Sequence, residues 1–450
     1  MAIVIPFKGT LYNSEVVGDM KGVVAPPYDV ISPKEQELYH QRSPYNIIRL
    51  ILGQIYPGDH ANCNRYTRAA ELLSSWLQRG VLRADTHPSF YLYRQTYSLE
   101  GRRRVRRGFI GLIRLEEYGK GDVLPHEKTL PAPKADRLAL MRSCRANLSP
   151  IFGLYSDPAQ EVNALLQEVE ARQVPRFQVE DDQGVEHALW ALSHKEVAEK
   201  VSSAMRDCQV LIADGHHRYE TALEYQREMR GILPSCSGEE SFNYTMIYLA
   251  NLDDDEGISI LPTHRLVRRI PDQGPKSLPS LLERIGEHFQ VEQLPLDPAG
   301  EDEAGWARAM LETMAQKGRG ARHAFGLYAG EDRAYQLTLK GEALPPVFLR
   351  GGIPEVWRSL DVVILHLLLL EGALGLTPEE IQGECLGYTQ DAAQAIRSVR
   401  SEGYSLAFLL NPTRIEEVRR VATAGHRMPE KSTYFYPKLL SGLVIHKFEE

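Results

Sequence analysis

Residues 210–219 read VLIADGHHRY, and this stretch decides how the chain folds around it. The apolar run over residues 210–212 predicts a buried strand, and residues 219–229 have the pattern of a helix. Gly215 permits the positive φ angle that a tight turn between the two elements requires. The sequence therefore predicts a strand, a turn and a helix N-terminus, with an acid, two imidazoles and a guanidinium in the turn.

The predicted turn gathers groups that bind phosphate. The first N–H groups of a helix lack intrahelical acceptors, and the positive end of the helix dipole favours an anion there. Arg218 can hold two phosphate or carboxylate oxygens through parallel hydrogen bonds. We therefore interpret Asp214, Gly215, His216, His217 and Arg218 as a phosphate-binding turn.

Two other interpretations fit the same residues. In the first, Asp214 is an N-cap, and His216, His217 and Arg218 point into water from the first helical turn. In the second, Asp214, His216 and His217 bind a metal ion. Adjacent side chains on a helix point about 100° apart, which makes the two histidines a poor pair of ligands for one ion.

The bulk properties predict a soluble, cytoplasmic protein, and the polar motifs predict a small-molecule substrate as its partner. Of the 450 residues, 43% are hydrophobic and 25% are charged, which suits about two to four packed domains. The net charge of -8 argues against a nucleic-acid partner, because such proteins present a basic face. The five cysteines form no CxxC pair, as expected in a reducing compartment. With no signal-peptide pattern and no apolar run that could span a bilayer, no membrane partner is expected, whereas a homo-oligomer is compatible with the sequence.

A second polar cluster reads PHEKT over residues 125–129. A loop glutamate near bound phosphates, here Glu127, can take a proton from an attacking hydroxyl. His126 and Lys128 flank it and are candidate phosphate ligands. Residue 130 is leucine, so the segment is not the HExxH motif of zinc proteases. The alternative is an ordinary polar connection between a strand and a helix.

Two further segments carry charged groups near strand or loop ends. His264 and Arg265 end a predicted strand, which is where ligand-binding groups tend to gather in α/β folds, so both are candidate phosphate or nucleotide ligands. Residues 425–432 read GHRMPEKS and nearly match the phosphate loop GxxxxGK[ST]. Glu430 replaces the second glycine and Pro429 removes an N–H donor, so we reject that assignment and leave the role of the C-terminal MPEKSTYFYPK segment open.

The whole chain resembles a conserved bacterial and archaeal family of unknown function that carries the DGHHR signature. The matching stretches lie between Pro6 and Val444 and read APPYDVIS, PHEKTLPAPKADRL, ANLSPIFGLY, IADGHHRYETAL, LPTHRLV and MPEKSTYFYPKLLSGL. This resemblance implies membership of the family, but it names no reaction.

A narrower resemblance implies a reaction. The PHE and DGHHR segments look like the two boxes of the ParB/sulfiredoxin superfamily, and they are similar in particular to those of its free serine kinases. The resemblance implies that Glu127 is the base for the serine hydroxyl. It also implies that Asp214, His216, His217 and Arg218 bind the donor's phosphates and the accompanying metal. The match covers about residues 90–265, and the 87 positions from Glu127 to Asp214 imply an insertion.

The expected fold is α+β, with a mixed-sheet ParB/sulfiredoxin-like core that holds both boxes. An N-terminal α/β segment is expected over residues 1–85 and the phosphate-binding core over residues 86–270. A small α/β unit is expected over residues 271–345, and a mainly helical region over residues 346–450.

The expected function is a kinase-type phosphotransferase of serine metabolism, acting between free serine and O-phosphoserine. The expected donor is ATP, ADP or pyrophosphate, with Mg2+ as the metal and Asp214 as its ligand. The alternatives are a non-catalytic, nucleotide-responsive regulator and a metal-dependent phosphoester hydrolase. The kinase mechanism requires the Glu127 carboxylate to lie within about 10 Å of His216, His217 or Arg218, because substrate and phosphoryl group fit between them.

Overall fold

The chain divides into two compact units in a computed structural model. The first unit comprises Met1–Ser259 and Phe435–Glu450, and the second comprises Ile260–Tyr434. The first unit is therefore assembled from two stretches of chain that lie on either side of the second unit in the sequence. The described residues are 2–233, 235–254, 256–295, 302–318, 323–330, 333–341, 345, 348, 352–383 and 385–449.

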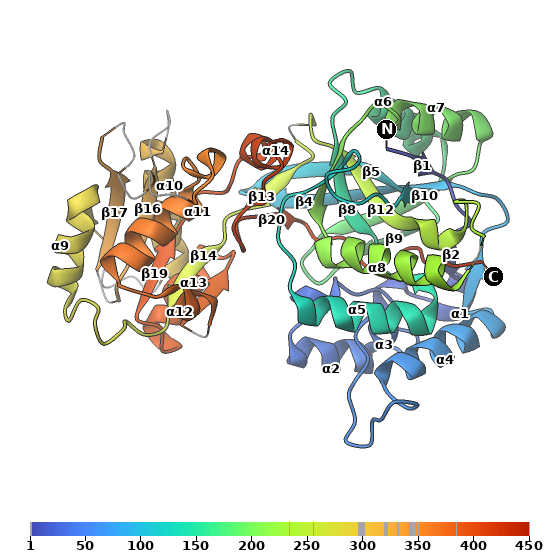
Figure 1. Ribbon diagram of the computed structural model, residues 1–450, viewed down its shortest axis with the longest axis horizontal. Helices are drawn as coiled ribbons and strands as arrows, with labels where there is room; N and C mark the ends of the chain where they lie inside the picture. Colours follow the sequence, from blue (N-terminus) through green and yellow to red (C-terminus); the bar gives the residue numbers. More distant parts are fainter. Residues whose placement is uncertain are drawn as a thin grey trace. The chain divides into compact units, whose positions relative to one another are not determined.

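A large mixed sheet forms the centre of the first unit (Figure 1). Its strand order is β6-β11-β8-β12-β5-β4-β10-β9, and β1 pairs with β5. The pairs β6–β11 and β8–β12 are parallel, and the other neighbours are antiparallel. The strands are β1 (Val4–Ile5), β4 (Phe90–Leu99), β5 (Arg102–Arg114), β6 (Val123–Pro125), β8 (Ile151–Tyr155), β9 (Phe177–Glu180), β10 (Glu186–Leu192), β11 (Val210–Asp214) and β12 (Tyr244–Asn251).

Helices pack on this sheet and on one another. In the first unit, α5 contacts both α4 and α8, and α6 contacts α7 (Figure 1). These helices are α2 (Pro33–Arg42), α3 (Ile48–Ile51), α4 (Arg65–Gln78), α5 (Pro131–Cys144), α6 (Glu161–Arg172), α7 (Lys195–Met205) and α8 (His216–Ile232). Helices and a large mixed sheet together confirm the α+β class. Short antiparallel pairs complete the unit: β2 (Thr10–Tyr12) with β3 (Leu82–Ala84), and β7 (Ala146–Asn147) with β21 (His446–Lys447).

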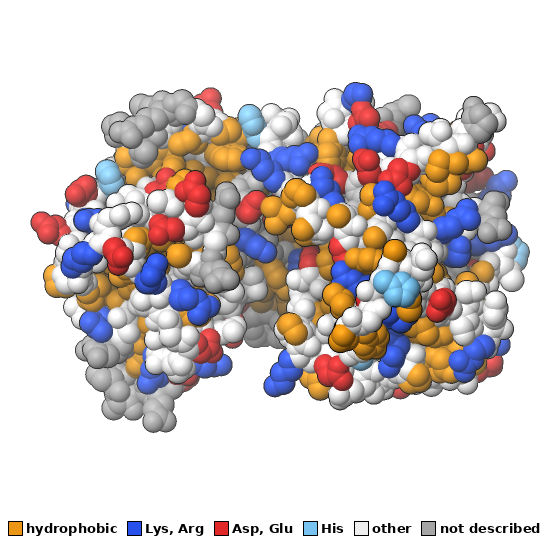
Figure 2. All heavy atoms as spheres, turned by 60° about the horizontal axis from the view of Figure 1, so that its bottom comes forward, with side chains coloured by type: hydrophobic (Ala, Val, Ile, Leu, Met, Phe, Trp, Pro, Cys, Tyr) orange, Lys and Arg blue, Asp and Glu red, His pale blue; other side chains and the backbone are white. Residues whose placement is uncertain are grey.

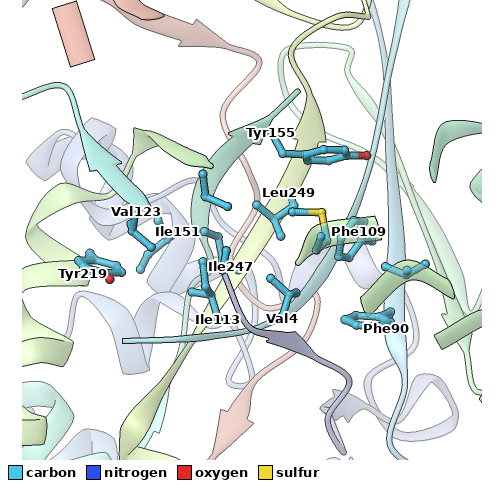
Figure 3. Packing of buried hydrophobic residues seen from close by; sticks show 14 of the residues in the cluster. Val4, Phe90, Phe109, Ile113, Val123, Ile151, Tyr155, Tyr219, Ile247 and Leu249 are labelled. Carbon is cyan, nitrogen blue, oxygen red and sulfur yellow. The ribbon is translucent and has the colours of Figure 1, made fainter. Parts of the chain in front are cut away.

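The core of the first unit lies between the sheet and the helices that cover it. Figure 3 shows Val4, Phe90, Ile113 and Ile247 from four strands and Tyr219 from α8 in one apolar cluster. All of these side chains are at most 2% exposed. Burial of this apolar surface fixes the position of α8, and with it the turn that precedes the helix.

The second unit contains a six-stranded antiparallel sheet with the order β15-β17-β16-β19-β14-β18. Its strands are β14 (His264–Val267), β15 (Phe289–Leu294), β16 (Ala324–Tyr328), β17 (Ala334–Leu339), β18 (Leu386–Thr389) and β19 (Leu406–Leu409). Its helical segments are α9 (Leu278–His288), α10 (Glu303–Lys317), α11 (Asp361–Ile364), the π-helical η6 (Leu365–Ala373), α12 (Pro378–Gln382), α13 (Ala392–Ser401) and α14 (Ile415–Thr423). The region expected to be mainly helical thus also supplies β18 and β19 to this sheet.

The surface mixes both signs of charge. On the face drawn in Figure 2, Lys and Arg side chains alternate with Asp and Glu, with apolar atoms between them. Within the described ranges, no helix combines the length and the apolar character needed to cross a membrane.

Candidate functional site

The predicted strand, turn and helix are present as β11, Gly215 and α8. Gly215 has φ 90°, a conformation that favours glycine. A Cβ atom at this position would also lie 2.9 Å from Cζ of Arg218. Gly215 is therefore required both for the turn and for the close approach of the Arg218 guanidinium.

A carboxylate and two cations meet at this turn. Oδ1 of Asp214 lies 3.5 Å from Nζ of Lys438, and Oδ2 lies 3.3 Å from Nη2 of Arg218. Burial by itself raises the pKa of Asp214, but the charges of Lys438 and Arg218 and a hydrogen bond from the Gly215 backbone outweigh it and lower the pKa. Asp214 is therefore ionised and held between two basic side chains.

Arg218 also has a structural partner. Its Nη1 donates to the carbonyl oxygen of Pro150, so the guanidinium bridges α8 and the start of β8. Only 12% of its side chain is exposed. The interpretation in which Arg218 points freely into water therefore does not describe this structure.

The loop that carries Glu127 lies against the start of α8. Strand β6 runs parallel to β11, with Pro125 paired to Ile212. The backbone N–H of His126 donates to Nε2 of His216 (3.2 Å), and the backbone N–H of Leu130 donates to Nε2 of His217 (2.9 Å). The two adjacent histidines thus hold the two ends of residues 126–130, and we call this arrangement the histidine clamp.

The clamp fixes how the imidazoles are used. Because Nε2 of His216 and of His217 accepts a backbone N–H, each ring is neutral and carries its proton on Nδ1. Burial lowers the pKa of His217, against the opposing charges of Asp29 and Glu220. The orientation about 100° apart that disfavours binding of one metal ion suits two separate loop contacts.

The side chain of His126, whose backbone N–H binds His216, is itself buried. Burial lowers its pKa to about 4, and Nδ1 lies 2.6 Å from the carbonyl oxygen of Ile212. Its ring centroid lies 4.7 Å from that of His216, in an edge-to-face arrangement. His126 is fully buried, so it positions the loop, whereas Glu127 is half-buried and Lys128 is exposed beside it.

The carboxylate of Glu220 on α8 binds one residue of the clamped loop and one residue of helix α5. Oε2 of Glu220 accepts from Oγ1 of Thr129 (2.6 Å) and from Nζ of Lys134 (3.0 Å). These bonds hold the far end of the loop against the second turn of α8. The local structure around Glu127 is thus fixed at several points by α8.

Lys438 reaches the site because a C-terminal segment is anchored on the sheet. The guanidinium of Arg106, 0% exposed, donates to the carbonyl oxygens of Tyr436 (3.2 Å) and Pro437 and to Oε1 of Gln95. Nε2 of Gln95 in turn donates to the carbonyl oxygen of Lys438 (2.9 Å). We call residues 435–438 the C-terminal strap.

The N-terminal segment contributes Tyr28 to the surroundings of Arg218. Tyr28, with Arg218 and Thr221, lines a cavity of about 50 Å3. Burial raises the pKa of the Tyr28 phenol to about 12, with contributions from the charges of Asp29, Arg137, Arg218 and Asp214. This cavity is large enough for a few non-hydrogen atoms.

Sequence reasoning did not find Lys438, Arg106 or Tyr28 as parts of the site. The only sequence signal for Lys438 was its place in the C-terminal stretch that resembles the family. Nothing in its position along the sequence connects it with Asp214. His264 and Arg265, also candidate ligands, lie on β14 in the second unit and are buried there.

Few of the described residues could hold a metal ion. Among the described residues, no group of three or more His, Cys, Asp and Glu side chains is arranged to hold a metal ion. Mg2+ is commonly bound through one or two carboxylates together with the phosphates of a substrate. Asp214 is one carboxylate at the turn, and both of its oxygens face cationic side chains, those of Arg218 and Lys438.

Comparison with known proteins places the chain in a family. The family model described as "Protein of unknown function (DUF1015)" matches residues 4–363, so the chain belongs to this family. This confirms the first of the two resemblances seen in the sequence. No curated protein matches the chain.

Several solved structures overlap with parts of this structure. A free serine kinase mutant in complex with ADP is 14% identical, with a TM-score of 0.31 over 70% of this chain and 84% of that one. A conserved hypothetical protein from Pyrococcus furiosus is also 14% identical, with a TM-score of 0.31 over 71% and 89%. SbnI from Staphylococcus aureus, truncated at its C-terminus, is 11% identical, with a TM-score of 0.31 over 74% and 85%. TM-scores this low carry no argument about the mechanism of this chain.

Proposed function

We propose that the protein is a small-molecule phosphotransferase that moves a phosphoryl group between ATP, ADP or pyrophosphate and the hydroxyl group of free serine. The observation that carries the proposal is the meeting of Arg218 and Lys438 around Asp214, at the N-terminus of α8. Two cations and one anion leave a net positive charge, which the helix dipole reinforces. Such a place favours the phosphates of a donor.

The transfer step uses residues on both sides of the histidine clamp. In the forward direction, the Glu127 carboxylate accepts the proton of the serine hydroxyl as that oxygen bonds to the terminal phosphorus. The bond from phosphorus to the bridging oxygen breaks, and the remaining phosphate leaves with its electrons. Arg218 and Lys438 neutralise the charge on the transferring and leaving oxygens. In this scheme the histidine clamp keeps Glu127 at a fixed distance from Arg218 and Lys438.

Asp214 has two tasks in this proposal. In the free protein it holds Arg218 and Lys438 in place, and with a donor it is the protein's ligand for Mg2+. Bound Mg2+ would supply further neutralisation of phosphate charge. The backbone N–H groups after Gly215 and the exposed Lys128 provide additional donors to phosphate oxygens.

The sequence resemblance to the free serine kinases supports serine as the acceptor and a ParB/sulfiredoxin-like core as the frame of the site. The adjacent parallel strands β6 and β11 place the PHE and DGHHR boxes side by side, as that mechanism needs. The cavity beside Arg218 can receive a few non-hydrogen atoms, so it could take part of a small polar acceptor such as serine.

A phosphorus NMR screen tests the proposal. Purified protein is incubated with Mg2+ and serine and, in turn, ATP, ADP or pyrophosphate, and the reverse reaction is run from O-phosphoserine. Phosphoserine formed with one donor is the expected result. Release of inorganic phosphate without serine would instead indicate a hydrolase. No turnover with any donor in either direction would contradict a phosphotransferase.

Arg218→Ala provides the residue-level test. Loss of a charged partner is expected to weaken donor binding by roughly 2–4 kcal/mol. Because Arg218 also binds the Pro150 carbonyl, the thermal unfolding of the variant must be measured beside its calorimetric titration with donor. Unchanged donor affinity in a folded variant would remove Arg218 from the binding site.

A further inference from the structure

A buried arginine in the second unit has no counter-charge among the described residues. Arg265 lies on β14 and is 1% exposed. Its Nη1 donates to the carbonyl oxygen of Thr263, but within the described ranges its Nε and Nη2 atoms have no hydrogen-bond partner. No carboxylate of the described residues forms an ion pair with it. A guanidinium removed from water in this way is strongly disfavoured unless an anion joins it.

Strand alternation identifies what shares the face of Arg265. Side chains two apart on a strand point to the same face, so Arg265 lies on the face of Val267. Val267 packs with Leu365 and Leu368 of η6 in one buried cluster. His264 points to the opposite face, where its Nδ1 accepts the backbone N–H of Leu410 (3.2 Å).

Two polar side chains are influenced by the Arg265 guanidinium. Tyr388 lies on β18 and is paired with Arg265 on the neighbouring strand β14. Cζ of Arg265 lies 5.3 Å from the centroid of the Tyr388 ring. His366 belongs to η6, and its Nε2 has no hydrogen-bond partner in the described part of the chain. Burial lowers the pKa of His366 to about 3, with a further contribution from the charge of Arg265. The guanidinium, an imidazole and a phenol therefore share one face of this sheet.

We propose that Arg265, His366 and Tyr388 form a binding site for an oxyanion, either a phosphate or a carboxylate group of a small ligand. The planar guanidinium offers the two unpartnered nitrogens Nε and Nη2, which match two oxygens of either group. His366 adds a further nitrogen, and the Tyr388 hydroxyl adds a donor at the rim. We take the side of Tyr388, which is 37% exposed, as the route by which a ligand would enter from solvent. This site belongs to the second unit and goes beyond the transfer site at Arg218.

The nearest competing account is neutralisation by a protein carboxylate. Glu430 contributes to the raised pKa of Tyr388, after burial and against the opposing charge of Arg265, so its charge reaches this region. No ion pair joins Glu430 to Arg265 among the described residues. If Glu430 were the true partner, Glu430→Gln would lower the midpoint of thermal unfolding, whereas our proposal expects that variant to bind an oxyanion at least as well as the wild type.

Hydrogen exchange read by mass spectrometry locates the binding. The whole chain is titrated with inorganic phosphate and, separately, with acetate, at constant ionic strength set by chloride. We expect exchange to slow at least about threefold in peptides covering β14, β18 and η6 with one or both anions, since binding to the folded state stabilises it. Slowing by phosphate alone assigns a phosphoryl ligand, and slowing by acetate alone assigns a carboxylate. No slowing of these peptides by either anion would overturn the proposal.

Arg265→Met and Arg268→Met form a matched pair of variants. Arg268 also stacks on a tyrosine, with Cζ 4.6 Å from the Tyr404 ring, but it lies at the surface. We expect Arg265→Met to abolish the anion-dependent slowing and Arg268→Met to keep it. Without anion, Arg265→Met should unfold at or above the wild-type temperature, because an unpaired buried charge is replaced by an apolar side chain of similar length. Failure of that variant to fold, or a lower midpoint, would show that the protein itself satisfies Arg265.

Discussion

Nζ of Lys438 lies 3.5 Å from Oδ1 of Asp214, which joins the C-terminal strap to the turn before α8. The two residues belong to different stretches of the first unit, one on each side of the second unit in the sequence. The charge of Lys438 is the largest of the influences that lower the pKa of Asp214. The strap is therefore part of the candidate site, and not only a terminal packing segment.

Lys438→Met is expected to weaken the binding of ATP or pyrophosphate by about 2 kcal/mol, the magnitude of one charge-assisted hydrogen bond. It should also raise the pKa of Asp214, because Arg218 becomes its only cationic partner in the described part of the chain. Calorimetric titration with each donor measures the effect. Lys431→Met, at an exposed position of the same C-terminal region, is the control. Equal affinities for the two variants would remove Lys438 from the site.

Arg106→Met tests whether the buried Arg106 guanidinium anchors the C-terminal strap. The change leaves the carbonyl oxygens of Tyr436 and Pro437 without their buried donor, and we expect the free energy of unfolding to fall by about 3 kcal/mol. Peptides covering the strap should exchange hydrogen faster. Arg103→Met, on the same strand with 74% of the side chain exposed, should leave both measurements unchanged. Normal strap exchange in Arg106→Met would disprove the anchoring.

Gly215→Ala and Gly184→Ala separate backbone strain from crowding. Both glycines have positive φ, 90° and 74°, so each substitution should cost about 1 kcal/mol of stability. Only at Gly215 does the added Cβ meet a neighbour, Cζ of Arg218 at 2.9 Å, whereas nothing lies within 4 Å at Gly184. We therefore expect Gly215→Ala alone to weaken donor binding as well. Chemical denaturation and titration with donor decide, and identical behaviour of the two variants would argue against a precise placement of Arg218.

The histidine clamp predicts that His217→Phe releases the loop at residues 126–130. Phenylalanine keeps an aromatic ring but offers no acceptor for the Leu130 N–H, whose bond is worth about 1 kcal/mol. Hydrogen exchange of the loop peptide should accelerate, and turnover should fall as Glu127 loses its fixed position. His194→Phe, at an exposed position before α7, serves as the control. An unaltered loop in His217→Phe would show that the other contacts suffice.

His126 is one of several buried histidines, among them His264, His366 and His446, that make stability depend on pH. Burial lowers the pKa of His126 to about 4, whereas an imidazole in an unfolded chain titrates near about 6.5. Between these values the unfolded state binds more protons, so the free energy of unfolding falls as the pH drops. The loss from His126 alone is about 3 kcal/mol. Chemical denaturation at several pH values should show a shallower slope for His126→Asn than for the wild type, and an unchanged slope would mean that other groups dominate.

Local patterns predicted the elements of the site better than its assembly. The apolar run before Asp214, the glycine and the following helix depend on neighbouring residues, so β11, Gly215 and α8 could be read from the sequence. The contact between Arg106 and Tyr436 joins positions 330 residues apart, and no periodicity carries such information. The four-residue strands β18 and β19 could not be predicted either, because a short apolar run fits a strand and a buried helix equally well.

The clamp shows a different limit. The residue types in the turn indicated phosphate binding, which stays a prediction for Asp214, His216, His217 and Arg218. The sequence did not indicate that His216 and His217 are engaged through Nε2 with the backbone of residues 126–130. An imidazole that accepts a backbone N–H and one that binds a ligand have the same letter in the sequence, so only the neighbouring loop distinguishes them.

The split of the first unit has a consequence for how the protein is made. Ribosomes synthesise the N-terminal stretch first, then the whole of the second unit, and only afterwards the strap with Lys438. Until the strap emerges, Asp214 lacks one of its two cations, and Arg106 lacks the carbonyl oxygens that it binds. Since domains generally fold as units during synthesis, the second unit can fold on the ribosome while the first is still incomplete. Under the proposed function, donor binding at this site would therefore have to wait until translation has passed both units.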